Sequence, residues 1–169
     1  QQNMGILILD SENALDEDYL QAIGVDINVN NFIYRGIKTI PDASSEWSTF
    51  TKLFRKHGMT DRYLICIDSL DMLLTASELD KFNKADSGGD QGQHAKQTKK
   101  MLATFQQDIK NLPMVALCTK QAYKEQDPIA ARSMPFVVTE AVKFAFTQAL
   151  MLQKLMLKDD DTKKYEGIA

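Results

Sequence analysis

The sequence predicts an α/β protein with a mostly parallel central sheet flanked by helices. Three short apolar runs, at residues 5–9, 63–67 and 114–118, do not alternate between polar and apolar side chains. Continuous runs of this length are typical of strands that are buried on both faces, as in a parallel sheet. Helical segments lie between the runs, so we expect βαβ units with right-handed crossovers.

The composition fits one globular domain. The chain has 169 residues, of which 44% are hydrophobic and 25% charged, and its formal net charge is −3. These values exclude a disordered chain and a fibrous repeat, and one domain is the default at this length. The only cysteines, Cys66 and Cys118, lie inside apolar runs, which excludes a disulfide scaffold and favours a reducing cytosol. No apolar stretch is long enough to span a membrane, so we expect no membrane partner.

The strands differ in how they end. The runs at 5–9 and 63–67 are each followed by an acid, Asp10 and Asp68, and residues 32–34 form a shorter fourth candidate strand.

Near the end of the chain, residues 147–157 could continue a helix over 137–146 or form a strand. The preferred interpretation is a long hairpin of residues 147–157 with 163–168, which turns at the aspartates of 159–161.

Three helices are predicted between the strands. The first covers 16–23, with Asp16 as its cap, and ends at Gly24. The second covers 46–57 and ends at Gly58, and the third covers 93–111 and ends before Pro113. The third has the clearest apolar stripe at helical spacing, formed by Thr98, Met101, Leu102, Phe105, Ile109 and Leu112.

Two segments are predicted to be loops, residues 83–92 and residues 119–136. Both follow the carboxyl end of a predicted strand, which is the edge where ligands bind in open α/β sheets. Long loops inside a compact domain are usually functional or disordered. We therefore look for a functional site at this edge.

Two acids at this edge are the candidates for chemistry. Asp68 ends a buried strand and precedes Ser69, so it could hold Mg²⁺ through water beside a phosphate. Glu12 follows the first strand and could orient or deprotonate a water molecule. Taken singly, each acid is better explained as an ordinary polar strand end or a surface carboxylate; the two together are more suggestive of a site than either alone. His57 and His94 have no Cys or acid at ligand spacing, so we expect no zinc site.

Four blocks of the sequence resemble the RecA-type recombinases, in the same order and at similar spacing. They are residues 9–26, with Leu-Asp-Ser-Glu-Asn at their start; residues 64–70, Leu-Ile-Cys-Ile-Asp-Ser-Leu; residues 86–95, which resemble the first DNA-contacting loop; and residues 139–144, which resemble the helix after the second. The phage UvsX-like strand-exchange proteins are the most similar branch. The resemblance implies a RecA-like ATPase core, active in the cytoplasm of a bacterial or phage-infected cell, that uses ATP and Mg²⁺.

The resemblance also implies roles for single residues. Glu12 matches the catalytic glutamate that polarises the attacking water, and Asp68 matches the acid associated with Mg²⁺, followed by Ser69 as in the family. Tyr19 matches the aromatic residue that stacks on adenine, and Asp16 an acid near the adenine amino group. For the polar sensor after the third core strand, the register offers Thr119, Lys120 or Gln121, and Lys143 and Phe144 match a pair at the filament interface.

The partners that the resemblance implies are single-stranded DNA and further copies of the chain. The two loops would grip the DNA backbone, with Lys81 and Lys84 near the first loop and Lys124 and Arg132 in the second as the basic candidates. Such binding would be salt-sensitive and largely independent of sequence. We also expect self-association through an uncovered apolar face.

The sequence departs from the family in its phosphate-binding residues. The pattern G-x-x-x-x-G-K-[ST] occurs nowhere, and no glycine pair precedes Lys143. We therefore interpret the chain as a partial core that alone binds ATP weakly and hydrolyses it negligibly. One alternative is a non-hydrolysing RecA-like module, or a split-protein half that acts in trans. Another is a receiver-like signalling domain in which Asp10 and Asp68 form the acidic cluster.

Overall fold

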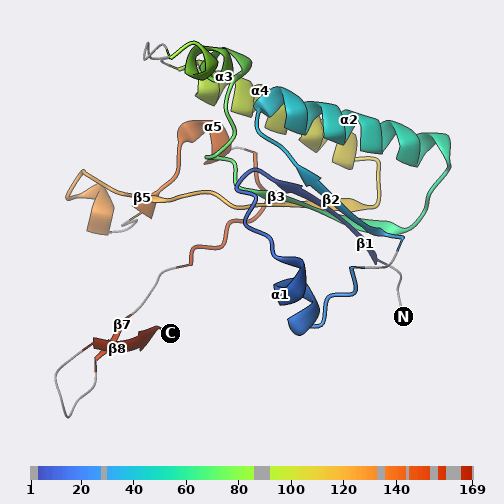
Figure 1. Ribbon diagram of the computed structural model, residues 1–169. Coiled ribbons are helices and arrows are strands. Elements are labelled where there is room, and N and C mark those ends of the chain that lie inside the picture. Colours follow the sequence, from blue (N-terminus) through green and yellow to red (C-terminus); the bar gives the residue numbers. More distant parts are fainter. Residues whose placement is uncertain are drawn as a thin grey trace.

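Four parallel strands form the central sheet (Figure 1). The computed structural model describes residues 4–27, 30–85, 92–132, 136–143, 145–152, 156–158 and 165–168. The strands are β1 (Met4–Asp10), β2 (Phe32–Gly36), β3 (Arg62–Asp68) and β4 (Met114–Cys118), in the spatial order β2-β1-β3-β4. The predicted α/β class, the parallel sheet and all four predicted strands are confirmed.

The strand order creates a topological switch point between β1 and β3. The chain leaves β1 toward β2 on one side, and it leaves β3 toward β4 on the other. β1 and β3 pair in parallel register over their whole length, and their last residues, Asp10 and Asp68, are register partners. Ligands in open α/β sheets bind outside the carboxyl ends of the strands at such a point.

Two long helices cover one face of the sheet, α2 (Ile40–Lys56) and α4 (Gln93–Ile109) (Figure 1). α4 begins where predicted and ends two residues earlier, and both helices turn an apolar stripe toward the strands. α2 begins six residues before the predicted start at 46, because Thr39 and Asp42 form a reciprocal capping box. Its predicted end is confirmed: His57 is the C-cap, and Gly58 has a φ of 57°.

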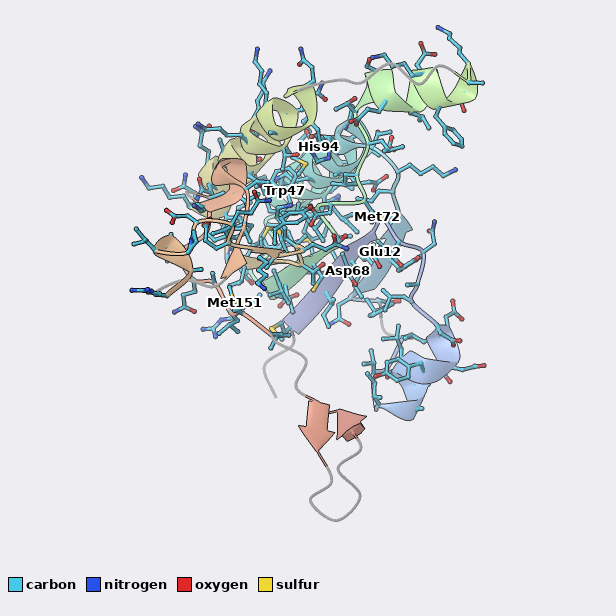
Figure 2. All side chains as sticks on the ribbon, turned by 90° about the vertical axis from the view of Figure 1, so that its left-hand side faces the viewer. Glu12, Trp47, Asp68, Met72, His94 and Met151 are labelled. Atoms are coloured by element: carbon cyan, nitrogen blue, oxygen red, sulfur yellow. The ribbon has the colours of Figure 1, made fainter. Side chains whose placement is uncertain are left out.

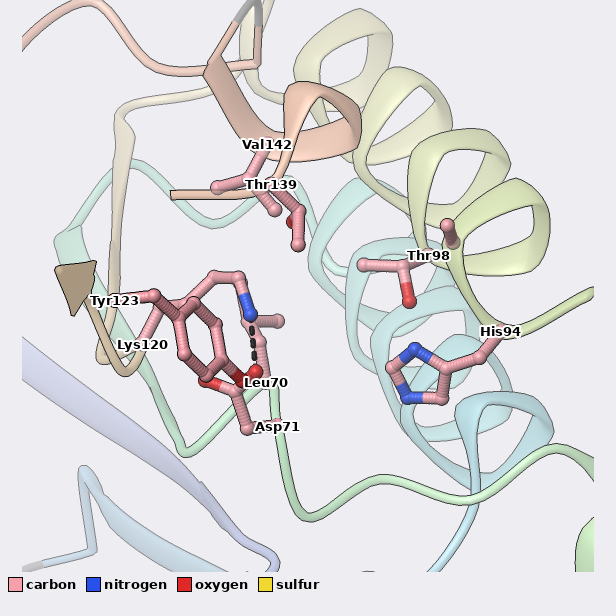
Figure 3. A pocket seen from close by; sticks show the side chains of 9 residues that line it. Leu70, Asp71, His94, Thr98, Lys120, Tyr123, Thr139 and Val142 are labelled. Carbon is pink, nitrogen blue, oxygen red and sulfur yellow. Dashed lines mark hydrogen bonds and ion pairs between the residues drawn. The ribbon is translucent and has the colours of Figure 1, made fainter. Parts of the chain in front are cut away.

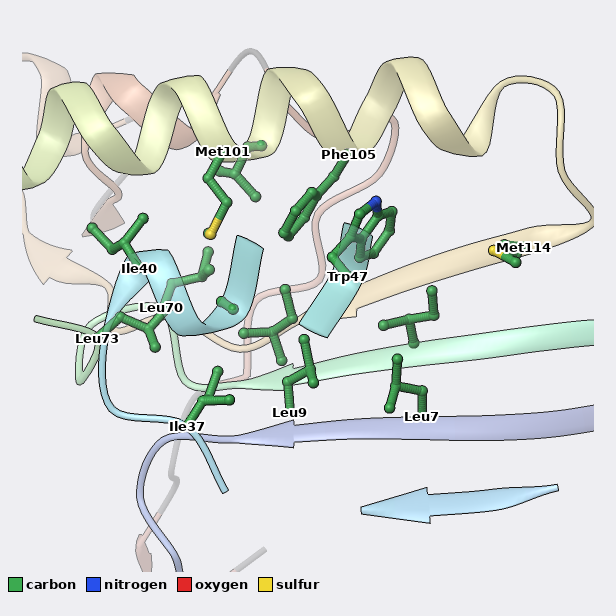
Figure 4. Close-up of a cluster of buried hydrophobic side chains, with 14 of the residues drawn as sticks. Leu7, Leu9, Ile37, Ile40, Trp47, Leu70, Leu73, Met101, Phe105 and Met114 are labelled. Carbon is green, nitrogen blue, oxygen red and sulfur yellow. The ribbon is translucent and has the colours of Figure 1, made fainter. Parts of the chain in front are cut away.

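The core lies between these two helices and the strands (Figure 4). Leu7, Leu9, Ile65 and Ile67 of the central strands are at most 2% exposed. Trp47 of α2 stacks on Phe105 of α4, with ring centroids 3.9 Å apart and an angle of 11° between the planes. The Trp47 indole also donates to Asp108 Oδ2 at 3.1 Å, so this contact fixes one helix on the other.

The prediction that the strands are buried on both faces is wrong for the described residues. The alternate side chains of β1, β3 and β4 form two apolar rows on the other face, Ile6–Leu64–Val115 and Ile8–Cys66–Leu117. The residues of β1 and β3 in these rows are half-buried, while Val115 is 64% and Leu117 53% exposed. The reason is that none of the long helices in the described ranges packs on this side (Figure 1). We call these six residues the open face.

Two shorter helices flank the strand ends. α1 (Glu17–Ala22) starts after Asp16, whose carboxylate accepts from the backbone N–H groups of Asp18 and Tyr19, as predicted. It lies on the opposite side of the sheet from α2 and α4, and none of its residues is buried (Figure 1). α3 (Ala76–Asn83) was not predicted; it begins with a capping box of Thr75 and Glu78.

The segment after β4 contains more structure than predicted. β5 (Tyr123–Lys124) pairs antiparallel with β6 (Phe136–Val137), and a short 3₁₀ helix covers Ala130–Arg132. The helix predicted over 137–146 is reduced to α5 (Glu140–Lys143), because Val137 belongs to the β5–β6 ladder. Residues 86–91 of the first predicted loop lie outside the described residues.

The terminal hairpin is confirmed but shorter than predicted. β7 (Met156–Lys158) pairs antiparallel with β8 (Tyr165–Ile168), and the predicted turn at 159–161 lies outside the described residues. Of the helices in the described ranges, none combines the length and the apolar character that a bilayer crossing requires.

Candidate functional site at the carboxyl edge of the sheet

Asp10 organises the turn that carries Glu12. The Asp10 side chain is 1% exposed, and its Oδ1 accepts from the backbone N–H groups of Glu12 at 2.9 Å and Asn13 at 2.8 Å. Oδ2 accepts from the Tyr34 hydroxyl at 2.9 Å. Partial burial raises the pKa of Tyr34, and the Asp10 carboxylate raises it further because it would repel a tyrosinate. The turn therefore holds Glu12 at a fixed place beyond β1.

Ser11 and Ser69 connect the ends of β1 and β3. The Ser11 hydroxyl donates to the Ser69 carbonyl and accepts from the Ser69 N–H, both at 2.8 Å. The Ser11 N–H donates to the Asp68 carbonyl at 2.7 Å, and the peptide bond between Asp68 and Ser69 is cis. These contacts extend the pairing of the strands beyond the sheet.

The two predicted catalytic acids share this edge, as Figure 2 shows. The Ser69 hydroxyl donates to Glu12 Oε1 at 2.9 Å. The Thr119 hydroxyl donates to Asp68 Oδ1, and the Thr119 backbone is anchored by its N–H to the Ile67 carbonyl at 3.0 Å. Glu12, Asp68, Ser69 and Thr119 thus form one cluster over the ends of β1, β3 and β4, which we call the acidic edge.

The residues after Thr119 contact a different acid. The Lys120 ammonium forms an ion pair with Asp71 Oδ1, and the backbone N–H of Gln121 donates to Asp71 Oδ2 at 2.6 Å. Of the three residues considered for the sensor position, only Thr119 therefore contacts the acidic edge through its side chain. Lys120 and Gln121 are held three residues further along the β3 loop.

The sequence alone predicted no role at this edge for Ser11 or Asp71. For Asp10 it indicated a role only in the receiver-like alternative. Asp10 and Ser11 directly follow an apolar run, which was the available signal for a strand-end cluster. Asp71 had no signal, because its partner Lys120 is 49 residues away in the sequence.

Two predicted adenine-contacting residues belong to α1. Asp16 uses its carboxylate to cap that helix, and Tyr19 is 62% exposed. α1 lies below the sheet in Figure 1, beyond the turn that carries Glu12. The structure therefore ties both residues to α1 and leaves the Tyr19 ring open to solvent.

The predicted basic residues lie on separate elements. Lys81 is on α3, and Lys84 caps the end of α3 and pairs with Asp80 at 2.7 Å. Lys124 lies on β5 and Arg132 on the 3₁₀ helix, and both are exposed. Lys143 is exposed on α5, and its predicted partner Phe144 lies outside the described residues.

The acidic edge offers oxygen ligands, which Mg²⁺ prefers. It supplies two carboxylates and two hydroxyls, and within the described ranges no three His, Cys, Asp or Glu side chains gather closely enough to hold a metal alone. Mg²⁺ usually keeps several waters and uses one or two carboxylates together with substrate phosphates. The donor set therefore fits Mg²⁺ that arrives with a nucleotide, while the glycine-rich phosphate cradle is absent from the 169 residues.

Both cysteines are poor nucleophiles. Burial raises the pKa of Cys118 to about 12, and the neighbouring Cys66 contributes to the shift. Burial also raises the pKa of Cys66, with a further contribution from Asp68. Since the thiolate is the reactive form, neither cysteine is suited to covalent catalysis near neutral pH.

The sequence matches no model of a known protein family, and a search of curated proteins finds no match. Assignment of a function therefore depends on the acidic edge, the fold and the motifs in the sequence.

Proposed function

We propose that this chain is part of the core of an ATP-dependent recombination protein that polymerises on single-stranded DNA and promotes strand exchange. The observation that carries the proposal is the acidic edge: Glu12 and Asp68 come from different strands, and Ser69 and Thr119 bind them at the switch point of a parallel sheet. Nucleotides bind at this place in open α/β sheets. We also propose that the fold is RecA-like.

Each residue of the acidic edge has a role in this function. ATP with Mg²⁺ would supply the phosphoryl group and the charge that neutralises it. Asp68 would hold the hydrated cation, with Thr119 fixing the orientation of its carboxylate. Glu12 would orient a water molecule, and Ser69 would hold the Glu12 carboxylate in place.

A second candidate is a non-hydrolysing module of the same fold, or a protein half that acts in trans. It is favoured by the absence of G-x-x-x-x-G-K-[ST] from the sequence, since that loop and its Lys supply most of the phosphate binding. Both candidates predict negligible ATP hydrolysis by this chain alone. A clear hydrolysis rate that disappears in Glu12→Gln would exclude the second candidate and would also contradict our expectation for the isolated chain.

Binding of single-stranded DNA tests the main proposal. We expect fluorescence anisotropy with a labelled oligonucleotide to show binding that weakens with salt. Replacing Lys124 and Arg132 by Ala should reduce the slope of log K against log salt by about 1.4, since each phosphate contact contributes about 0.7. The matched control replaces Lys52 and Lys56 of α2, which are exposed away from the carboxyl edge. An equal slope in both double variants would show that the DNA contacts lie elsewhere, and no binding at all would contradict the proposal.

A further inference from the structure

A pocket of about 270 Å³ opens at the carboxyl edge, beside the start of α4 (Figure 3). One wall is α4, with His94 and Thr98. The opposite wall consists of Asp71 from the β3 loop and Lys120 and Tyr123 from the segment after β4. None of these residues belongs to the acidic edge, so the pocket is a separate site.

The buried hydroxyl of Thr98 indicates that the pocket holds a ligand. It is 3% exposed, and its hydroxyl has no hydrogen-bond partner in the part of the chain that the structure describes. A threonine within a helix commonly bonds back to the carbonyl four residues earlier, as Thr104 does with Lys100 at 3.1 Å. The Thr98 hydroxyl instead points into the pocket, toward the His94 ring (Figure 3). A buried hydroxyl without a partner is unfavourable, so a ligand that bonds to it gains affinity.

His94 places an acceptor next to this hydroxyl. Its Nε2 lies 2.6 Å from the Leu73 carbonyl, and since a carbonyl only accepts, Nε2 carries the proton. In the neutral ring Nδ1 is then an acceptor, and it is the ring nitrogen nearer Thr98 in Figure 3. Together, Nδ1 and the Thr98 hydroxyl offer an acceptor and a donor side by side.

The opposite wall carries no net charge. Lys120 and Asp71 form an ion pair whose side chains are only 10% and 15% exposed. Their charges cancel, so the pocket does not favour a free phosphate or a divalent cation. Tyr123 adds an aromatic ring, on which a planar group can stack. A small, neutral, planar heterocycle with a donor and an acceptor on one edge fits both walls.

We propose that this pocket holds one unstacked nucleobase, hydrogen-bonded to Thr98 and His94 and in contact with the Tyr123 ring. Proteins that bind single strands combine aromatic stacking with contacts to the edges of splayed bases. The base belongs to bound single-stranded DNA, because the exposed Lys124 follows Tyr123 in β5 and can contact a flanking phosphate. This source depends on the proposed function; a free nucleoside has the same chemistry.

Three probes test the pocket: an oligonucleotide with one 2-aminopurine, the same strand with an abasic site at that position, and free 2-aminopurine nucleoside. The variant is Thr98→Val, which keeps the shape and removes the hydroxyl, and the control is Thr104→Val on an exposed turn of α4. Urea unfolding checks that both variants fold. We expect 2-aminopurine fluorescence in the strand and in the nucleoside to change on binding. With end-labelled strands followed by fluorescence anisotropy, we expect Thr98→Val to weaken binding of the intact strand roughly five- to tenfold but not that of the abasic strand.

The outcomes separate this inference from the proposed function. Equal affinities of Thr98→Val and Thr104→Val for the intact strand would overturn the pocket as a base site while DNA binding stands. Binding of the free nucleoside that Thr98→Val weakens, without any DNA binding, would support the pocket and overturn the proposed function. If neither the nucleoside nor the oligonucleotide responds to Thr98→Val, the inference is wrong.

Discussion

The two faces of the central sheet carry similar side chains but differ in what covers them. On the face under α2 and α4, Leu9 and Ile65 are 0% exposed, whereas Leu117 on the open face is 53% exposed. Two residues after the last open-face residues of β1 and β3, Ile8 and Cys66, these strands end in Asp10 and Asp68. The apolar runs therefore form strands, whereas the positions of the helices determine which face of the sheet becomes a core. The acids therefore lie at the rim of the less covered side.

The largest effect should come from truncating the covered face. We expect Leu9→Ala to lower the free energy of unfolding by about 2–5 kcal/mol, because it leaves a cavity in a closed core. Ile8→Ala, its neighbour on the open face, removes a similar volume from a half-buried site, and we expect at most about half that loss. Urea unfolding followed by circular dichroism measures both. Equal losses would mean that the open face is as well covered as the core.

The reactivities of the two cysteines test the difference between the two faces of the sheet, because Cys118 lies on the covered face and Cys66 on the open face. With the pKa of Cys118 raised from 9.0 to about 12, its thiolate population below pH 9 is about 1,000-fold smaller than that of an ordinary cysteine. We expect iodoacetamide to modify Cys66 first, as read by mass spectrometry. Modification of Cys118 at the same rate in the folded protein would contradict the assigned burial; in urea the two should react equally.

The same shift predicts how stability depends on pH. Cys118 is favoured as the neutral thiol in the folded state, so its contribution is complete below pH 9.0 and is lost as the pH rises toward about 12. Cys118→Ala should therefore lose less stability over this alkaline range than the wild type. Parallel urea curves at each pH provide the measurement.

The smallest effect on stability, and the sharpest on assembly, should come from charging the open face. We expect the wild type to self-associate at micromolar concentration, since exposed apolar patches and edge strands promote association. Val115→Lys with Leu117→Lys should shift sedimentation velocity toward the monomer and change stability by about 0.5 kcal/mol or less. Leu53→Lys, at a residue of α2 that is 48% exposed, is the control. A wild type that is already monomeric would show that the open face is not an interface.

Local signals in the sequence were enough to predict the four strands of the central sheet and several helix boundaries. Runs such as 63–67 specify strands through apolar continuity, and Asp16 and Gly58 mark helix boundaries through capping and a positive φ. The capping boxes at Thr39 and Thr75 are equally local signals, and they explain the start of α2 and the presence of α3. The sequence could not show whether a helix packs on the open face, because apolar residues at alternate strand positions look the same whether or not another element covers them.

The candidate site was predictable only where strand ends determine it. Glu12 and Asp68 could be placed together because carboxyl ends of adjacent parallel strands meet at one edge. The pairing of Asp71 with Lys120, and of Thr119 with Asp68, depends on how the loops after β3 and β4 fold over each other. Such long-range contacts leave no periodic trace in the sequence.

The most direct test of the acidic edge as a nucleotide site is an NMR titration of the protein with ATP, with Mg²⁺ or with EDTA, since it detects weak binding. We expect Mg²⁺-dependent shifts of the backbone amides of Ser11, Glu12, Ser69 and Leu70, and we expect Asp68→Asn to remove their dependence on Mg²⁺. Shifts confined to other regions, such as the Thr98 pocket or the outer surface of α2, or no shifts at millimolar nucleotide, would contradict the assignment.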